Sequence, residues 1–313
     1  MASGPSTPTT SSYPPPSFID PATLMQIRAL ELRAKVVVEG FMTGLHRSPY
    51  HGFSVEFTEY RQYVSGDDLR YLDWKLYARS DRFYLKRFED ETNLRCHLLV
   101  DNSRSMSYGS LPYTKADYAK TLAGTLAYFL NQQKDAVGLL RFSETVDEYL
   151  PPRHRPGHLR RLLQCLEHQP EGTGTGLITA LERSAELVRK RGLFVILSDF
   201  LTPLADLESR LSYLRAARNE VAIFQILDPA EFTFPFQESM QFVDVESGRE
   251  IYVDPEAGRK AYVQKFQAHS QALAKCCERL GVHFRTVNTE SPLELALGDF
   301  LRMRAVVSQT RRR

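Results

Sequence analysis

The amino-acid sequence predicts an α/β protein whose mostly parallel sheet is flanked by helices, with a small N-terminal β-rich module. From Arg95 onward, apolar strand-like runs alternate with amphipathic helical stretches, which is the pattern of parallel βαβ units. Between Gly40 and Asn93, aromatic, charged and glycine residues mix with little helical periodicity, which is typical of a small β-rich module. The 313 residues suffice for one large α/β domain and a smaller one.

The N-terminal part of the chain divides into a tail and a module. Residues 1–19 are rich in Ser, Thr and Pro and are predicted to be a disordered tail, because they cannot bury enough apolar surface to offset chain entropy. Residues 20–94 are predicted to hold one helix and the β-rich module, whose clearest strand is Phe83–Phe88. Asp20 and Pro21 supply an N-cap and a first helical residue. The apolar face of this helix is predicted from four residues: Leu24, Ile27, Leu30 and Ala34.

Residues 95–307 are predicted to form the α/β domain, followed by a basic tail over residues 308–313. The expected strands of the sheet are Cys96–Val100, Ala136–Phe142, Thr145–Leu150 as an antiparallel edge, Leu193–Leu197, Val221–Leu227 and Val282–Val287. The expected helices are Lys115–Gln132, Gly176–Lys190, Pro203–Ala217, Pro255–Leu280 and Pro292–Val306. Met240–Val253 interrupts the alternation, and predicts a hairpin insertion at about residues 231–254.

The first expected strand of the α/β domain ends in a cluster of oxygen-bearing side chains. The apolar run Leu98–Val100 is followed by Asp101, Ser103 and Ser105. Ligands of parallel α/β sheets collect beyond the carboxyl ends of the strands, and a carboxylate with hydroxyls suits Mg²⁺ or Mn²⁺ better than zinc or iron. The alternative is that these short polar residues only form a turn or cap a helix.

Two later segments carry matching residues. Thr175 lies in the glycine-rich run Gly172–Leu177, and Asp199 ends the apolar run that begins at Leu193. Asp-x-Ser-x-Ser, a later Thr and a still later strand-terminal Asp resemble the metal-ion-dependent adhesion site of von Willebrand factor A domains. The resemblance implies that one Mg²⁺ or Mn²⁺ ion is held by five residues: Asp101, Ser103, Ser105, Thr175 and Asp199. It also implies that a carboxylate of another protein takes the remaining position on the ion.

The segment between Gly40 and Asn93 resembles the domain-of-unknown-function 58 family. The matching motifs are Gly44–Ser48, Gly52–Phe57, Arg61–Trp74 and Ala78–Arg79. In that family the module directly precedes a von Willebrand A domain, and here the match covers about residues 28 to 305. Many members carry two transmembrane helices ahead of the module, whereas this sequence resembles the short soluble branch. The resemblance implies an adaptor or co-chaperone that works with a MoxR-type AAA+ ATPase or its client.

Carboxylates and guanidiniums crowd together in the module around the single Trp of the chain. The residues concerned are Asp67, Asp68, Arg70, Asp73, Trp74 and Arg79. One interpretation is a network of Arg–carboxylate pairs that holds a small irregular domain together. The other is a partner-binding surface, because a Trp beside charged residues is typical of interaction hot spots. Metal binding by Asp67 and Asp68 is disfavoured because no hydroxyl or carboxylate tripod surrounds them. Trp74 is expected to be buried against the α/β domain.

The motif content favours a binding protein over an enzyme. The sequence contains neither a phosphate-binding Gly-x-x-x-x-Gly-Lys-Ser/Thr loop nor a Gly-x-Ser-x-Gly nucleophile elbow. The predicted function is a non-catalytic, metal-dependent protein-interaction adaptor. The alternative is a Mg-dependent phosphoryl hydrolase that uses the same site. A hydrolase would need a nucleophile or base near the ion, and Asp101 and Asp199 are already committed to it.

Charge and cysteine content limit the partners and the compartment. Forty basic against 38 acidic residues give a formal net charge of +2, which argues against nucleic acid as the main partner. The four cysteines form no Cys-x-x-Cys pair, so reduced thiols are expected. The sequence has no run long and apolar enough for a membrane span and no signal peptide, so a cytoplasmic protein is expected. The sequence does not determine the oligomeric state.

Overall fold

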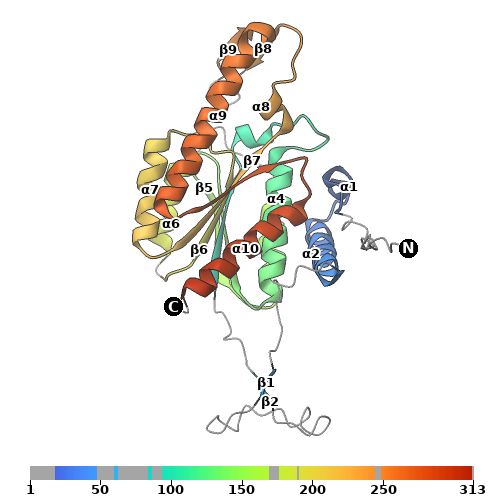
Figure 1. The fold of residues 1–313 in the computed structure, drawn as a ribbon, viewed down its shortest axis with the longest axis vertical. Helices are drawn as coiled ribbons and strands as arrows, with labels where there is room; N and C mark the ends of the chain where they lie inside the picture. The colour runs from blue at the N-terminus through green and yellow to red at the C-terminus, as the bar shows by residue number, and fades with distance from the viewer. Residues whose placement is uncertain are drawn as a thin grey trace, which may run out of the picture.

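A six-stranded sheet lies between two layers of helices (Figure 1). The computed structural model describes residues 18–47, 60–62, 84–86, 94–168, 176–188, 190–243 and 248–311. The strand order is β10-β7-β6-β3-β4-β5, in which β5 pairs antiparallel with β4 and all other pairs are parallel. The strands are β3 (Arg95–Asp101), β4 (Ala136–Phe142), β5 (Val146–Arg153), β6 (Leu193–Ser198), β7 (Glu220–Leu227) and β10 (His283–Asn288). The predicted α/β class, with a mostly parallel sheet flanked by helices, is confirmed.

Each face of the sheet has its own apolar core. One core packs against α1 (Pro21–Met25), α2 (Leu30–Arg47), α4 (Lys115–Gln132), α5 (His158–Glu167) and α10 (Leu293–Arg311). The other packs against α6 (Leu177–Leu187), α7 (Leu204–Ala216) and α9 (Pro255–Leu280). Because side chains alternate along a strand, Leu98 and Val100 of β3 enter the first core while Leu99 enters the second. A sheet that is covered on both faces explains the nearly continuous apolar runs of the inner strands.

The N-terminal region differs from the single helix that the apolar spacing predicts. The chain forms two helices, α1 and α2, with a break between Met25 and Leu30. The backbone N–H of Leu30 donates to the Glu167 carboxylate of α5 at 3.0 Å, so a distant side chain satisfies the first turn of α2. Leu24, Leu30 and Ala34 are buried as expected, although they lie on two helices.

Helix α2 also continues to Arg47, beyond Gly40, where the change in sequence character predicts the start of the β-rich module. Its Phe41 packs against the first core, which explains why the helix persists there. Within the module, β1 (Tyr60–Gln62) pairs antiparallel with β2 (Tyr84–Lys86). The β2 strand lies inside the predicted Phe83–Phe88 strand, and the remainder of the module lies outside the described residues.

The carboxyl end of the sheet carries the loops and insertions of the domain. A short 3-10 turn, η2 (Arg104–Ser107), follows β3, and α8 (Pro229–Thr233) follows β7. Next come β8 (Met240–Val243) and β9 (Glu250–Val253), which pair antiparallel in the hairpin expected there. In Figure 1, α9 rises past the sheet and the β8–β9 hairpin lies at its far end, above α8. Within the described ranges, every helix is too short or too polar to cross a membrane.

Candidate metal centre

The loop after β3 holds Asp101 in a fixed, buried position. The side chain is 1% exposed. Its Oδ1 accepts the backbone N–H of Ser103 at 2.9 Å, and its Oδ2 accepts the Ser198 hydroxyl of β6 at 2.5 Å. The backbone N–H of Asn102 donates to Phe142 O at 2.7 Å, which ties the loop to the end of β4. Contacts with both neighbouring strands therefore set where the carboxylate points.

The Ser103 and Ser105 hydroxyls lie side by side in the turn that enters η2. Their Oγ atoms form a hydrogen bond with each other, at a distance of 3.1 Å. Neighbouring ligands of an octahedral Mg²⁺ ion, with bonds of 2.0–2.1 Å, are separated by about 3.0 Å. The hydroxyl pair therefore has the spacing of two adjacent ligands of such an ion. Together with the Asp101 carboxylate, it forms a hard-oxygen set that fits Mg²⁺ or Mn²⁺.

The second predicted carboxylate, Asp199, follows β6 directly and is fully buried. Its Oδ2 accepts a hydrogen bond from the Lys115 ammonium of α4 at 2.9 Å. The same ammonium donates to Glu231 of α8 at 2.7 Å. The exposed fractions of the Lys115 and Asp199 side chains are 1% and 0%, so this is an ion pair sheltered from water.

Charge at this end of the sheet is unbalanced. Burial and the neighbouring Asp199 raise the pKa of Asp101 above its usual range. Burial would lower the pKa of Lys115, but the nearby Asp199 and Glu231 outweigh it and raise that pKa. Lys115 therefore stays cationic, yet its single ammonium serves two carboxylates. Within the described residues, the groups that donate hydrogen bonds to Asp101 are neutral. An added cation would relieve the repulsion between Asp101 and Asp199.

The structure brings part of the predicted ligand set together. Asp101 ends β3, Ser103 and Ser105 lie at the start of the η2 turn that follows it, and Asp199 follows the neighbouring strand β6. Thr175 lies outside the described residues, as do all six module residues proposed for partner binding: Asp67, Asp68, Arg70, Asp73, Trp74 and Arg79. In the described ranges, no group of three or more His, Cys, Asp or Glu side chains is placed to hold a metal. An ion at this end therefore depends on serine hydroxyls.

Three residues of the site were not predicted from the sequence. Lys115 begins α4, and a lysine in the first turn is unusual because the helix dipole disfavours a cation there. Glu231 stands three residues after Asp228, which is the spacing of a capping box, and the two residues form one. Ser198 directly precedes Asp199 at the end of a strand. These local signals were available in the sequence, but they did not indicate which distant residues would meet.

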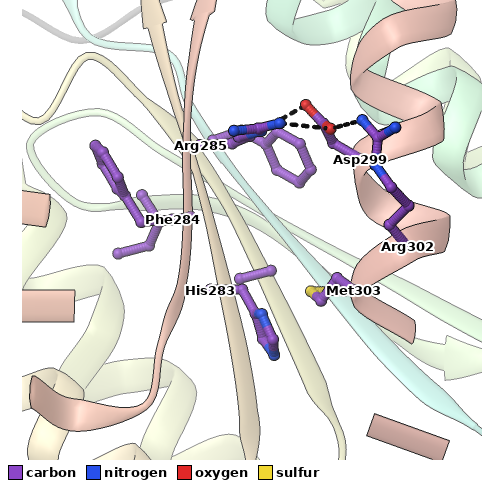
Figure 2. Close-up of a pocket in the computed structure, with 9 residues that line it drawn as sticks. His283, Phe284, Arg285, Asp299, Arg302 and Met303 are labelled. Carbon is purple, nitrogen blue, oxygen red and sulfur yellow. Dashed lines mark hydrogen bonds and ion pairs between the residues drawn. The ribbon is translucent and has the colours of Figure 1, made fainter. Parts of the chain in front are cut away.

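A separate hollow of about 240 Å³ lies beside the edge strand β10. Figure 2 shows Arg285 of β10 and Arg302 of α10 both directed at the Asp299 carboxylate. The two guanidiniums are therefore already paired with an acid. The residues that line this hollow come from β7, β10 and α10 and include none of the predicted metal ligands.

Comparisons with known proteins give a family and several relatives. The family model described as "Protein of unknown function DUF58" matches residues 59–272. An uncharacterized protein of Mycobacterium tuberculosis (strain ATCC 25618 / H37Rv) is 30% identical over 244 residues, covering 75% of this chain and 76% of its own length.

Two solved structures resemble the fold. An aerotolerance-related membrane protein of Bacteroides fragilis has a TM-score of 0.47 and 15% identity, covering 67% of this chain and 99% of its own. The conserved hypothetical protein BatB of Bacteroides thetaiotaomicron has a TM-score of 0.46 and 14% identity, covering 68% of this chain and 98% of its own. At these TM-scores the likeness says nothing about activity.

Proposed function

We propose that this chain, which belongs to the DUF58 family of proteins of unknown function, is a non-catalytic adaptor. In this proposal it binds a partner protein through a divalent metal ion. The observation that carries this proposal is the pair of serine hydroxyls 3.1 Å apart beside the buried Asp101 carboxylate. This arrangement supplies ligand chemistry for Mg²⁺ or Mn²⁺ at the carboxyl end of a parallel sheet.

The proposed ligands come from three segments of the chain. They are Asp101, Ser103, Ser105, Thr175 and Asp199. When bound, the ion supplies a positive charge that can hold an outside carboxylate. The protein's residues position that charge: Ser198 and the Ser103 backbone orient Asp101, and Lys115 holds Asp199.

The engagement of the acidic side chains supports binding rather than catalysis. Both oxygens of Asp101 accept hydrogen bonds, and Asp199 is paired with an ammonium. A phosphoryl hydrolase would need a carboxylate or another base free to accept a proton beside the ion. Among the described residues of the site, Asp101, Asp199 and Glu231 each already accept a hydrogen bond. The adaptor is therefore the better supported function.

The proposed partner is a MoxR-type AAA+ ATPase, or its client, that offers a carboxylate to the ion. Family resemblance supports the identity of the ATPase. Side chains at the same end of the sheet support a docking surface, because the large apolar residues Tyr108, Leu201 and Phe232 are exposed there. Tyr108 and Leu201 lie in the segments after β3 and β6, which also carry proposed ligands, and Phe232 lies on α8 after β7.

Calorimetric titration tests the metal, and a binding assay tests the partner. Wild type is expected to bind Mg²⁺ and Mn²⁺, and Asp101→Ala to lose that binding. Equal binding by the two proteins would show that Asp101 is not a ligand.

In the binding assay, EDTA and the double substitution Ser103→Ala/Ser105→Ala should each weaken capture of the purified ATPase. Arg160→Glu, an exposed change on α5, is the matched control and should leave capture unchanged. Capture that survives both EDTA and the serine changes would remove the metal site from the interface. The module segment Gly66–Arg79 would then be the better candidate.

A further inference from the structure

The buried ammonium of Lys115 lies near two carboxylates and one aromatic ring of the site. Its Nζ is 2.9 Å from Asp199 Oδ2 and 2.7 Å from Glu231 Oε1. The Tyr108 ring lies 5.9 Å away, close enough to add a cation–π attraction. The Lys115 side chain is 1% exposed, so its charge is balanced by these groups rather than by water.

The position of this lysine is costly unless it serves the site. It occupies the first turn of an 18-residue helix, where the partial positive charge of the helix terminus repels a cation. Removing an ammonium from water costs several kcal/mol in addition. The helix already has an N-terminal capping box made by Thr114 and Asp117, so Lys115 adds nothing to the cap. Its favourable contacts are with Asp199 and Glu231.

The ammonium occupies one of the two oxygens of the Asp199 carboxylate. Asp199 Oδ2 accepts a hydrogen bond from Lys115, while Oδ1 accepts a long hydrogen bond of 3.4 Å from the Leu201 backbone N–H. Direct coordination of an ion by Oδ2 would require the ammonium to leave. A cation already present in the chain therefore competes for Asp199 with a cation from solution.

We propose that Lys115 is a built-in counter-ion of Asp199 that holds this carboxylate away from direct contact with the ion and so sets the metal affinity of the site. This inference rests on the metal site of the proposed function, and it adds Lys115 as a residue that lowers the metal affinity of that site. Lys115 is a positioning residue, because it acts on the ion through Asp199.

Glu231 determines how firmly the ammonium is held. Its other oxygen accepts the backbone N–H of Asp228 at 2.7 Å, so its position is fixed by the start of α8. Asp228 in turn accepts the Ser110 backbone and hydroxyl at 2.8 and 2.6 Å. Lys115 therefore lies between two acids, of which Glu231 is fixed by a short hydrogen bond from the backbone. Glu231→Gln should leave the ammonium to Asp199 alone and weaken metal binding.

Titration of MgCl₂ and MnCl₂ into variants of the full chain tests the proposal. Lys115→Met is expected to bind both ions at least tenfold more tightly than wild type, and Glu231→Gln less tightly. A lysine with only a structural role would not raise metal affinity when it is removed. Equal affinity of wild type and Lys115→Met would overturn the proposal.

A double-mutant cycle shows whether the lysine acts through Asp199. In an Asp199→Asn background, Lys115→Met should give a gain in affinity at least threefold smaller than in wild type. An undiminished gain would mean that the lysine acts as a distant charge, and the proposal would be wrong.

Two further outcomes remain decisive. If Lys115→Met does not fold, Lys115→Met/Glu231→Gln removes one charge of each sign and should show the same rise in affinity. If wild type binds no metal but Lys115→Met does, the proposed role of Lys115 as counter-ion is supported. The same result would show that the adaptor function of the wild-type protein does not depend on a metal. If neither wild type nor Lys115→Met binds Mg²⁺ or Mn²⁺, both the metal site and the proposed role of Lys115 are wrong.

Discussion

The two ends of the central sheet both bury polar side chains, but only one end leaves them out of balance. At the amino end, Asp135 precedes β4 and is fully buried. It accepts the Leu94 backbone N–H at 3.3 Å and pairs with Arg304 at 3.3 Å. Asn219 precedes β7, accepts from the Gly192 backbone at 3.1 Å and donates to Leu214 O at 3.2 Å. These groups hold strand entries in register.

The carboxyl end has acids that outnumber the cations facing them. Lys115 serves both Asp199 and Glu231, and Asp101 relies on neutral donors. Both side-chain amide atoms of Asn102 are buried without a hydrogen-bond partner among the described residues. Native proteins rarely leave such groups unpaired. Burial of polar groups alone therefore does not distinguish the two ends, whereas the excess of carboxylates over ammonium groups at the carboxyl end does.

The largest change in unfolding free energy is expected at the amino end of the sheet, where the buried acid Asp135 is paired with Arg304. Asp135→Ala should lower the free energy of unfolding by about 4 kcal/mol, because it leaves Arg304 without its buried acid and the Leu94 N–H without an acceptor. Urea unfolding measures this loss. Asp206→Ala, which removes an exposed carboxylate from the first turn of α7, is the control and should cost less than about 1 kcal/mol. A cost as small for Asp135 would contradict its structural role.

A pH effect of similar size is expected from His97 in the amino half of β3. This side chain is 5% exposed and stacks on Phe194 with ring centroids 4.9 Å apart. Burial and Arg95 lower the pKa of His97 to about 4, against 6.5 for the free side chain. Between these values the unfolded chain binds the proton and the folded chain does not. Stability is therefore lost as the pH falls from 6.5 to 4, by about 3 kcal/mol in total.

The difference in unfolding free energy between wild type and His97→Phe isolates this contribution, because other titrating groups cancel. The wild type should lose about 3 kcal/mol relative to the variant over the same pH interval. Parallel curves for the two proteins would show that His97 is not held neutral by the fold.

Stabilisation by Mg²⁺ should depend on residues at the carboxyl end of the sheet and not on residues at the amino end. Mg²⁺ at 100 times its dissociation constant should raise the unfolding free energy of wild type by about 2.7 kcal/mol. Asp101→Ala should abolish this increment, whereas Asp135→Asn at the opposite end should keep it. Thermal unfolding with and without MgCl₂ measures both. If Asp135→Asn loses the Mg²⁺-dependent stabilisation, or Asp101→Ala keeps it, the ion does not bind specifically at the carboxyl end.

The parts of the fold that the sequence predicts well are those whose boundaries are set locally. Helix α4 matches its predicted span because Thr114 and Asp117 form a capping box at its start. Helix α9 matches because Asp254 and Pro255 open it and Gly281 closes it. In contrast, the break between α1 and α2 depends on Glu167, which is 137 residues from Leu30 in the sequence. No local pattern contains that contact.

The candidate site divides in the same way. The Asp101 loop is continuous in sequence, so its Asp-x-Ser-x-Ser spacing could be recognised. The contacts of Lys115 with Asp199 and Glu231 join residues separated by 84 and 116 positions. Side-chain periodicity places such residues on a face or at a strand end, but it does not pair them. The charge balance of the site, on which its chemistry depends, therefore emerges only in three dimensions.

The smallest effect concerns a glycine at the amino end of β10. Gly281 ends α9 with a φ of 63°, where an added Cβ is strained, and its Cβ would meet Arg215 at 3.1 Å. Gly281→Ala should cost about 1 kcal/mol of unfolding free energy. Gly40→Ala is the matched control, because this helical glycine has room for a Cβ at 3.8 Å from its nearest neighbour and should gain about 0.5–1 kcal/mol. Both variants should keep the full Mg²⁺ increment, because neither alters the charge at the carboxyl end. A change in that increment would show that the two ends of the sheet are energetically coupled.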